Sequence, residues 1–358
     1  MRIIQMLPTF AYGDAIGNDT LSLQDTLRDA GYETEIYAEV IDVKLGKDAA
    51  KHASEYQYQD GDIIFYHLST GSNLNYKITE YPCRRIIMYH NITPPEFFRG
   101  YSAEAEKACG EGLRATKFLG KRTDLCIVDS AYNKQDLIEM GYTCPMEVLP
   151  ILIAFDDYKK EPDKKVIKKY DDDWVNIVFT GRVVPNKCHQ DIIAAFYYYK
   201  KYIQPKSRLF LVGRYDGAPS FKAQLDAYAN SLGVKDVYFT GHVRFNEILA
   251  YYNIADVFVC MSEHEGFCVP LVEAMYFGVP IIAYDSTAIG DTLGGSGLLL
   301  KDKSPEVVAE AINLVVTNKE LAKQLVDGEK ERLKDFEHSK IKKRFLEIME
   351  NFLAGEKE

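Results

Sequence analysis

The sequence predicts an α/β protein made of two doubly wound parallel-sheet domains. First, its 358 residues exceed what one hydrophobic core usually organises, so two domains of roughly 150 to 180 residues are expected. Second, short apolar, β-branched runs alternate with helical patterns along the chain. Third, these runs are nearly continuously apolar, which is typical of parallel strands covered on both faces.

The first domain is predicted over residues 1–155. Helical patterns at 20–31 and 102–118 separate some of its strands. Its predicted strands are RIIQMLP (2–8), ETEIYAE (33–39), GDIIFYHLS (61–69), RRIIMYH (84–90), DLCIVDS (124–130) and MEVLPILI (146–153).

A polar, charged linker is predicted over 156–174, where apolar residues lack periodicity except at Val166 and Ile167. The second domain is predicted over 175–337. Its predicted strands are WVNIVFTG (174–181), SRLFLVG (207–213), DVYFTG (236–241), ADVFVCMS (255–262), VPIIAYD (279–285) and SGLLL (296–300). Such sheets bind ligands beyond the carboxyl ends of their strands, so two of them facing each other predict a cleft.

The last segment, 338–358, is predicted to be an amphipathic helix that crosses back to the first domain. It is locally basic, as is the stretch 99–122. Two interpretations stay open for these charges: a solvated helix face, or peripheral contact with anionic lipid.

Composition excludes several classes of protein. The formal net charge of −10 argues against nucleic-acid binding, which needs a clustered basic surface. No apolar run of about 18 residues is present, and the amino terminus has a strand pattern, so we expect a cytoplasmic protein. The seven cysteines are scattered singly without metal-ligand spacing, and we expect them to be reduced and mostly buried.

The stretch SEHEGFCVPLVEAMYFGVP (262–280) carries the strongest chemical signal. A loop follows the strand ADVFVCMS, and Pro270 is predicted as the first residue of a helix that Gly278 and Pro280 end. The amide groups at the start of this helix suit an anionic or strongly polar ligand.

Two glutamates flank this helix start. Glu265 lies on the loop, and Glu273 lies about one turn inside the helix. Carboxylates repel phosphate but accept hydrogen bonds, and two oxygens match a pair of neighbouring hydroxyls. A ligand with hydroxyls at both ends and phosphates between them is a nucleotide sugar.

Cations for the phosphates are predicted in FTGRVVPNKCHQD (179–191). Arg182 follows the end of a strand, and Lys187 lies on the loop that leads into the next helix. The two side chains could neutralise a diphosphate without a metal. No metal or cofactor is therefore expected, and the consecutive aspartates at 171–173 are assigned to the solvated linker.

The segments TGRVVPNK (180–187), VYFTGHV (237–243), SEHEGFCVPLVEAMYFGVPIIAYDS (262–286) and GGSGLLL (294–300) resemble, in order and spacing, the retaining family 4 glycosyltransferases, part of the glycosyl transferases group 1. That resemblance implies the GT-B fold, in which two Rossmann-like domains face a cleft. The sequence departs from the common pattern at Cys188, where glycine is usual, and at Asp291, where glutamate is frequent.

The resemblance also implies roles for individual residues. Glu265 would hold hydroxyls of the donor sugar, Glu273 the ribose diol, and Arg182 with Lys187 the diphosphate. The first-domain loop with Gly13 and Gly17 would close over the donor phosphates. The remaining implied donor-binding residues are Gly266, Phe267, Cys268 and Val269, through their amide groups, and His242 and Val243, which would border the base.

Other interpretations stay open for several of these residues. Glu265 and Glu273 could instead be structural partners of Arg182, Lys187 or Arg214. Gly13 and Gly17 could form a tight turn only. His90, at the end of RRIIMYH, is either an internally hydrogen-bonded histidine or a catalytic residue that meets the donor sugar or the acceptor.

We therefore expect a retaining, metal-independent hexosyltransferase that uses a UDP- or GDP-linked sugar. Glu265, Arg182, Lys187 and His90 are its predicted catalytic residues. The expected acceptor is a hydroxyl of a sugar or lipid-linked saccharide, in cell-surface polysaccharide or glycolipid synthesis. The alternative is a non-catalytic nucleotide-sugar-binding partner of another transferase. A dinucleotide-dependent oxidoreductase is disfavoured because the sequence lacks GxGxxG.

Overall fold

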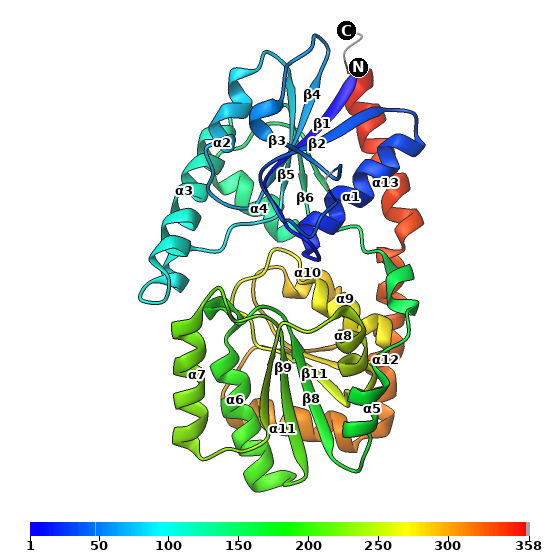
Figure 1. Cartoon of the computed structure of the whole chain (residues 1–358). Helices are drawn as coiled ribbons and strands as arrows, with labels where there is room; N and C mark the ends of the chain where they lie inside the picture. The colour runs from blue at the N-terminus through cyan, green and yellow to red at the C-terminus, as the bar shows by residue number, and fades with distance from the viewer. Residues whose placement is uncertain (47, 356–358) are drawn as a thin grey trace. The chain divides into compact units, whose positions relative to one another are not determined.

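The computed structural model describes residues 1–46 and 48–355. The chain forms two compact α/β units (Figure 1). Unit 1 comprises residues 1–99, 103–155 and the chain from Asp335 onward, and unit 2 comprises 100–102 and 156–334. Each unit contains one parallel sheet, as the alternating pattern predicted.

The sheet of unit 1 has the strand order β3-β2-β1-β4-β5-β6-β7, and every neighbouring pair is parallel. The short edge strand β3 was not predicted, because two polar residues carry no apolar pattern. The strands are β1 (Arg2–Phe10), β2 (Glu33–Ile41), β3 (Lys51–His52), β4 (Ile63–Leu68), β5 (Arg84–Tyr89), β6 (Leu125–Val128) and β7 (Met146–Val148).

The first helix of unit 1 starts five residues before the predicted pattern. Asp14 caps it, since its Oδ1 accepts the Gly17 N–H at 2.5 Å, and this satisfies one of the amide groups that a helix start leaves unpaired. The helices of unit 1 are α1 (Ala15–Asp29), α2 (Leu74–Lys77), α3 (Ala103–Leu119), α4 (Ala131–Glu139) and α13 (His338–Ala354).

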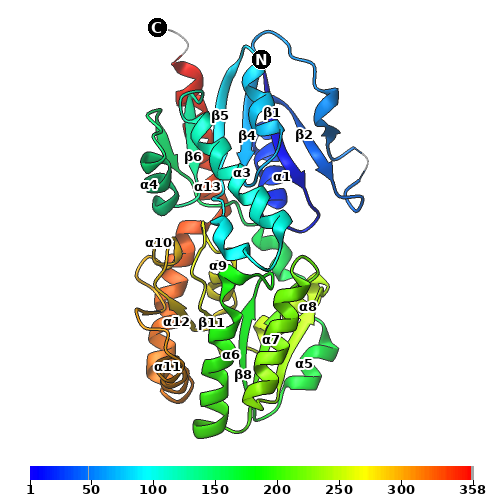
Figure 2. The same cartoon turned by 90° about the vertical axis from the view of Figure 1, so that its left-hand side faces the viewer.

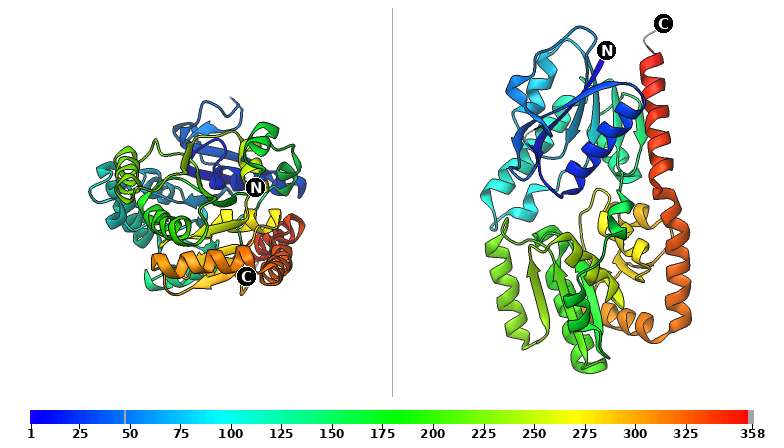
Figure 3. Two further views of the ribbon diagram at one scale, coloured as in Figure 1. Left: turned by 90° about the horizontal axis from the view of Figure 1, so that it is seen from below. Right: turned by 45° about the vertical axis from the view of Figure 1, so that its right-hand side comes forward.

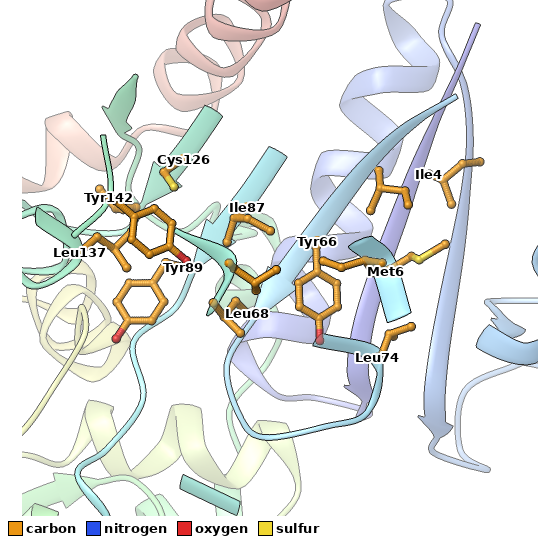
Figure 4. Packing of buried hydrophobic residues seen from close by; sticks show 14 of the residues in the cluster. Ile4, Met6, Tyr66, Leu68, Leu74, Ile87, Tyr89, Cys126, Leu137 and Tyr142 are labelled. Carbon is orange, nitrogen blue, oxygen red and sulfur yellow. The ribbon is translucent and has the colours of Figure 1, made fainter. Parts of the chain in front are cut away.

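Both faces of this sheet are buried, because successive side chains of a strand point to opposite sides. On one face Ile4, Tyr66 and Ile87 belong to the cluster in Figure 4. On the other face Phe65 packs against Phe345 of the C-terminal helix α13, with ring centroids 5.9 Å apart. Helix α13 lies beside α1 (Figures 1 and 3). The amphipathic pattern of the last segment therefore covers the sheet of unit 1.

The sheet of unit 2 has the order β10-β9-β8-β11-β12-β13 and is also parallel throughout. Its order reverses between β8 and β11, which are neighbours in the sheet, just as the order of unit 1 reverses between β1 and β4. The strands are β8 (Val175–Thr180), β9 (Ser207–Val212), β10 (Val237–Gly241), β11 (Val257–Cys260), β12 (Ile281–Tyr284) and β13 (Leu298–Leu300).

Helices cover both faces of this second sheet: α6 and α11 contact one face, and α8 and α9 the other (Figure 2). The helices of unit 2 are α5 (Lys164–Tyr170), α6 (His189–Tyr198), α7 (Pro219–Leu232), α8 (Phe245–Asn253), α9 (Val269–Phe277), α10 (Ile289–Leu293), α11 (Pro305–Thr317) and α12 (Lys319–Leu333).

The segment predicted as a linker, 156–174, folds as part of unit 2. It contains α5, and the buried Tyr170 at the end of this helix packs edge-on against Phe210, with ring centroids 4.7 Å apart. The charged residues of the segment obscured this helix, because only Val166, Ile167 and Tyr170 offer an apolar face.

No helix in the described part of the chain is both long and apolar enough to cross a bilayer.

Candidate active site

Three predicted site residues follow the two strands at which the order of the unit 2 sheet reverses. Arg182 and Lys187 follow β8, and Glu265 follows the neighbouring strand β11. In open parallel sheets, ligands bind at the carboxyl ends of the strands where the strand order reverses. The sheet topology thus brings together residues that are about 80 positions apart in the sequence.

Lys187 and Glu265 form a buried ion pair. The Lys187 Nζ lies 2.5 Å from Oε1 and 2.6 Å from Oε2 of Glu265, and the two side chains are 15% and 8% exposed. Burial opposes the charge of Lys187, but the Glu265 carboxylate outweighs it and raises the pKa of the lysine. The partnership that the sequence left open for Glu265 is therefore present.

This ion pair keeps bonding capacity for a ligand. An ammonium group has three N–H donors, and a carboxylate has about four lone-pair sites. The ion pair uses two N–H donors of Lys187 and two lone-pair sites of Glu265. One N–H of Lys187 and about two acceptor sites of Glu265 therefore remain. The pair can thus meet a phosphate oxygen on the lysine side and hydroxyls on the glutamate side.

The loops that carry the pair are tied together. The side-chain amide of Asn186 donates to the carbonyl of His264 at 2.9 Å, and the Glu263 amide donates back to the Asn186 carbonyl at 2.9 Å. The amide of Glu265 itself donates to the Thr287 hydroxyl at 2.9 Å. These bonds hold both charges in place before any ligand arrives.

Glu273 is held by the hydroxyl groups of two tyrosines. The Tyr158 hydroxyl donates to Oε1 at 2.8 Å, and the Tyr252 hydroxyl donates to Oε2 at 2.7 Å. Burial raises the pKa of the Glu273 carboxyl, and the two hydroxyls oppose part of that rise. In a chain with 25 tyrosines, no sequence signal distinguishes these two.

We expect Tyr158→Phe to raise the pKa of Glu273 further, because one of the two hydroxyls that favour its charged form is lost. The free energy of unfolding should fall by about 1 kcal/mol, as for a single hydrogen bond. Carboxyl titration by NMR and urea unfolding measure the two effects. Tyr276→Phe, which alters a neighbouring ring of the same cluster, is the control and should leave the Glu273 titration in place.

The start of α9 lies next to Glu265. The helix begins at Val269, one residue before the predicted Pro270, and ends at Gly278 in a left-handed conformation with φ 65°. Gly266 and Val269 are partly exposed, whereas Phe267 and Cys268 are buried. The positive dipole end of this helix adjoins the loop that carries Glu265.

The other predicted residues of unit 2 also follow strands. Arg182 is exposed and forms no ion pair with any described residue. His242, after β10, is exposed, and Val243 packs against a small core cluster around Phe210. Arg214, after β9, pairs with Asp216 at 2.6 Å.

In unit 1, the loop after β1 is built around its two glycines. Gly13 occupies an exposed turn with φ 74°. At Gly17, a Cβ would lie 2.6 Å from the carbonyl oxygen of Ala11, so only glycine fits. The Gly17 amide is already bonded to Asp14, so a contact with phosphate would have to come from another amide of the loop.

His90 belongs to a buried hydrogen-bonded chain. Its Nδ1 lies 3.0 Å from Oδ2 of Asp129, and its Nε2 lies 3.0 Å from Nδ1 of His67. The Nε2 of His67 in turn lies 3.0 Å from Oε1 of Gln5, whose amide group donates to the Thr20 carbonyl at 3.2 Å. The chain runs across the neighbouring strands β1, β4, β5 and β6 of the sheet.

The donors and acceptors of this chain assign its protons. The carbonyl of Gln5 can only accept, so His67 carries its proton on Nε2 and accepts at Nδ1. His90 must then donate from Nε2, and its Nδ1 shares a hydrogen bond with Asp129.

The electrostatics agree with this assignment. Burial opposes a charge on His90, but the Asp129 carboxylate outweighs it and raises the pKa of His90. Burial and the charge of His90 hold the pKa of His67 well below its usual value. The His90 side chain is 1% exposed, and both of its nitrogens have protein partners. The internal hydrogen bonding that the sequence left open for His90 is thus present, and His67, Asp129 and Gln5 had no sequence signal.

Residues 159–332 match the family described as Glycosyl transferases group 1. The whole chain has the GT-B fold. The structure of sucrose-phosphate synthase from Thermosynechococcus elongatus superposes with a TM-score of 0.78 at 17% identity, covering 99% of this chain and 100% of that one. The structure of Anabaena HepE in complex with UDP and glucose superposes with a TM-score of 0.76 at 17% identity, covering 98% of this chain and 99% of that one.

Curated relatives are similar over part of their length. An uncharacterised glycosyltransferase of Methanocaldococcus jannaschii is 28% identical over 195 residues, 53% of this chain and 48% of that protein. A GDP-mannose-dependent alpha-(1-6)-phosphatidylinositol monomannoside mannosyltransferase of Mycobacterium tuberculosis is 27% identical over 218 residues, which are 57% of this chain and 55% of that protein. The chain spans about half the length of these relatives.

Proposed function

We propose that the protein is a retaining glycosyltransferase that moves a hexose-type sugar from a UDP- or GDP-linked donor to a hydroxyl acceptor. The observation that carries this proposal is the Lys187–Glu265 pair, with Arg182 on the same loop as the lysine, at the point where the sheet of unit 2 reverses its order. The glycosyltransferase family match supports it, and the relatives' names and bound ligands include both GDP-mannose and UDP.

The residues have distinct roles in this proposal. The exposed guanidinium of Arg182 and the remaining N–H of Lys187 bind the diphosphate and stabilise the charge that grows on it as the sugar leaves. Glu265 uses its remaining acceptor sites for hydroxyls of the donor sugar. Glu273 binds the ribose diol, while Tyr158 and Tyr252 hold its carboxylate in position. His242 and Val243 border the base.

The transfer step needs no protein nucleophile. The bond between the anomeric carbon and the phosphate oxygen breaks while the acceptor oxygen bonds to the same face of that carbon. The departing phosphate oxygen takes the acceptor proton. In this scheme Arg182 and Lys187 supply the positive charge, so the proposal requires no metal or other cofactor. In this proposal His90 stays buried within its hydrogen-bonded chain and does not touch the reacting atoms.

A lipid-linked or free saccharide is the proposed acceptor, in cell-surface polysaccharide or glycolipid synthesis, and the proposed location is the cytoplasm. The basic helix α13 gives limited support to membrane contact. Three of its cations lie near acids: Lys340 at 2.6 Å from Asp335, Lys342 at 3.9 Å from Asp29, and Arg344 at 2.6 Å from Glu147. This pairing favours the solvated-face interpretation over lipid binding.

A panel of UDP- and GDP-linked sugars tests the proposal, with thermal stabilisation and release of free nucleoside diphosphate as the two measurements. We expect one donor to stabilise the protein and to be consumed, and product NMR to show the donor's anomeric configuration. Stabilisation without any release would support the alternative, a non-catalytic binding partner. No stabilisation by any donor would contradict both.

Arg182→Ala should then lower kcat roughly 100-fold, because a charge that acts on the leaving diphosphate is lost. Arg182→Lys keeps the positive charge but lacks the planar guanidinium group. Its kcat should therefore lie between those of the parent protein and of Arg182→Ala. Arg214→Ala is the matched control, since Arg214 follows the adjacent strand β9 but pairs with Asp216. Equal losses in the Arg182 and Arg214 variants would refute the assignment.

A further inference from the structure

Two thiols lie beside Glu265, although their cysteines are scattered in the sequence. The ligand atoms of Cys260, Glu265 and Cys268 are all within 4.8 Å of one another. All three residues are buried, with exposures of 0%, 7% and 6%. This group adjoins the Lys187–Glu265 pair, and the proposed transfer reaction uses neither thiol.

The local fold directs both thiols to the same point. Cys260 is the last residue of β11, and Cys268 caps α9 after the loop has turned back. Cys268 has a φ of 74°, in the left-handed region that favours glycine, so its side chain is held there against the preference of its backbone. Glu265 lies on the loop between the two cysteines.

The chemistry of these ligands selects a particular class of ion. Two thiolates and a carboxylate suit Zn²⁺ and similar thiophilic cations, and three protein ligands leave a fourth position open. A divalent cation with two thiolates and one carboxylate has a net charge of −1, which the ammonium of Lys187 balances. One carboxylate oxygen can bind the cation while the other keeps its bond to Lys187. The buried group is therefore neutral with the ion bound.

We propose that Cys260, Cys268 and Glu265 form an inhibitory site for a thiophilic divalent cation of the Zn²⁺ class. Binding releases the two thiol protons, and both thiolate sulfurs bond to the ion. The ion occupies acceptor sites of Glu265 that the donor sugar would need, so cation and nucleotide sugar compete. The competition rests on the proposed function, whereas cation binding does not.

Cadmium titration of the reduced protein tests the site directly, because cadmium–thiolate bonds absorb in the ultraviolet. The expected result is one Cd²⁺ per chain, with release of about two protons measured by a pH indicator. The absorption band should disappear in Cys268→Gly, which removes the thiol and suits the left-handed backbone, and in Cys260→Ser.

A second thiol pair provides the matched control. Cys126 and Cys144 in unit 1 have their sulfur atoms 3.6 Å apart, without a carboxylate in a shared ligand group among the described residues. The double variant Cys126→Ser/Cys144→Ser should keep the tight Cd²⁺ site. A band that persists in Cys268→Gly, with far-ultraviolet circular dichroism showing that the variant is folded, would overturn the proposal.

Competition is measured with Zn²⁺ and the donor found in the sugar panel. We expect Zn²⁺ to weaken donor binding at least tenfold in the parent protein and to have no effect in Cys268→Gly. Equal donor binding with and without Zn²⁺ would overturn the inhibitory part of the proposal. If no nucleotide sugar binds, the proposed function fails, but the cadmium titration still decides whether the cation site exists.

Discussion

Replacing Lys187 by alanine is expected to destabilise unit 2 by about 3–5 kcal/mol, because it leaves a buried carboxylate without its partner. Both side chains are mostly shielded from water, so solvent compensates little for the lost contact. Transfer activity should fall at least 100-fold, since the proposed leaving group also loses a cation. Urea unfolding and initial rates measure the two effects.

A double variant separates stability from function. Lys187→Met/Glu265→Gln removes both charges while keeping similar side-chain volume, so most of the lost stability should return. Activity should stay low, because neither the cation nor the carboxylate is restored. If the free energy of unfolding of Lys187→Ala lies within 1 kcal/mol of the parent's, the ion pair does not contribute substantially to stability. If the double variant regains activity, the catalytic assignment of both residues is wrong.

The second large effect is expected at Asp19, in unit 1. Its Oδ1 accepts the Leu152 amide at 2.8 Å, and its Oδ2 has no hydrogen-bond partner among the described residues. Burial raises the pKa of this carboxyl to about 7 from its ordinary value of 3.8. Such a shift corresponds to ~4 kcal/mol between the protonated and the ionised form.

The sign follows from proton linkage. The folded protein holds the Asp19 proton more tightly than the unfolded chain does, so its contribution to stability is present below pH 4 and is lost as the pH rises to about 7. The amide side chain introduced by Asp19→Asn cannot ionise, and its oxygen can still accept from Leu152. The stability of Asp19→Asn relative to the parent should therefore rise by ~4 kcal/mol between pH 4 and pH 8.

Urea unfolding of the two proteins across this pH range provides the measurement. The charge of Asp19 raises the pKa of His90, and the charge of His90 lowers that of Asp19, so the difference between the two proteins reports Asp19 together with its coupling to His90. Asp25→Asn, at an exposed position of the same helix α1, is the matched control. If the difference in free energy of unfolding between the parent and Asp19→Asn does not change with pH, Asp19 stays ionised in the folded protein over this range.

Much of the local structure follows from local pattern. Apolar runs identified the main strands of both sheets, because strands buried on both faces leave few polar positions. Pro270 and Gly278 located helix α9 to within one residue, because proline suits the first turn and glycine the left-handed end of a helix. Strand ends likewise located Arg182, Lys187 and Glu265, since parallel strands present their carboxyl ends at one edge.

Contacts between segments that are distant in the sequence could not be predicted from local pattern. Cys126 and Cys144 lie 18 positions apart in the sequence, yet their sulfur atoms lie 3.6 Å apart. Tyr158 was assigned to a solvated linker, yet it binds Glu273. Periodicity shows which face of an element is buried, but it does not show which element covers that face.

The amino-acid pattern was therefore sufficient for the two parallel sheets, the helix start beside Glu265 and the set of charged residues at strand ends, because each depends on residues close together in the chain. The tertiary structure alone decided that Lys187 pairs with Glu265, that His90 is enclosed by His67 and Asp129, and that two thiols adjoin the ion pair. Those contacts depend on strand order and register, which join residues from separate strands and crossovers.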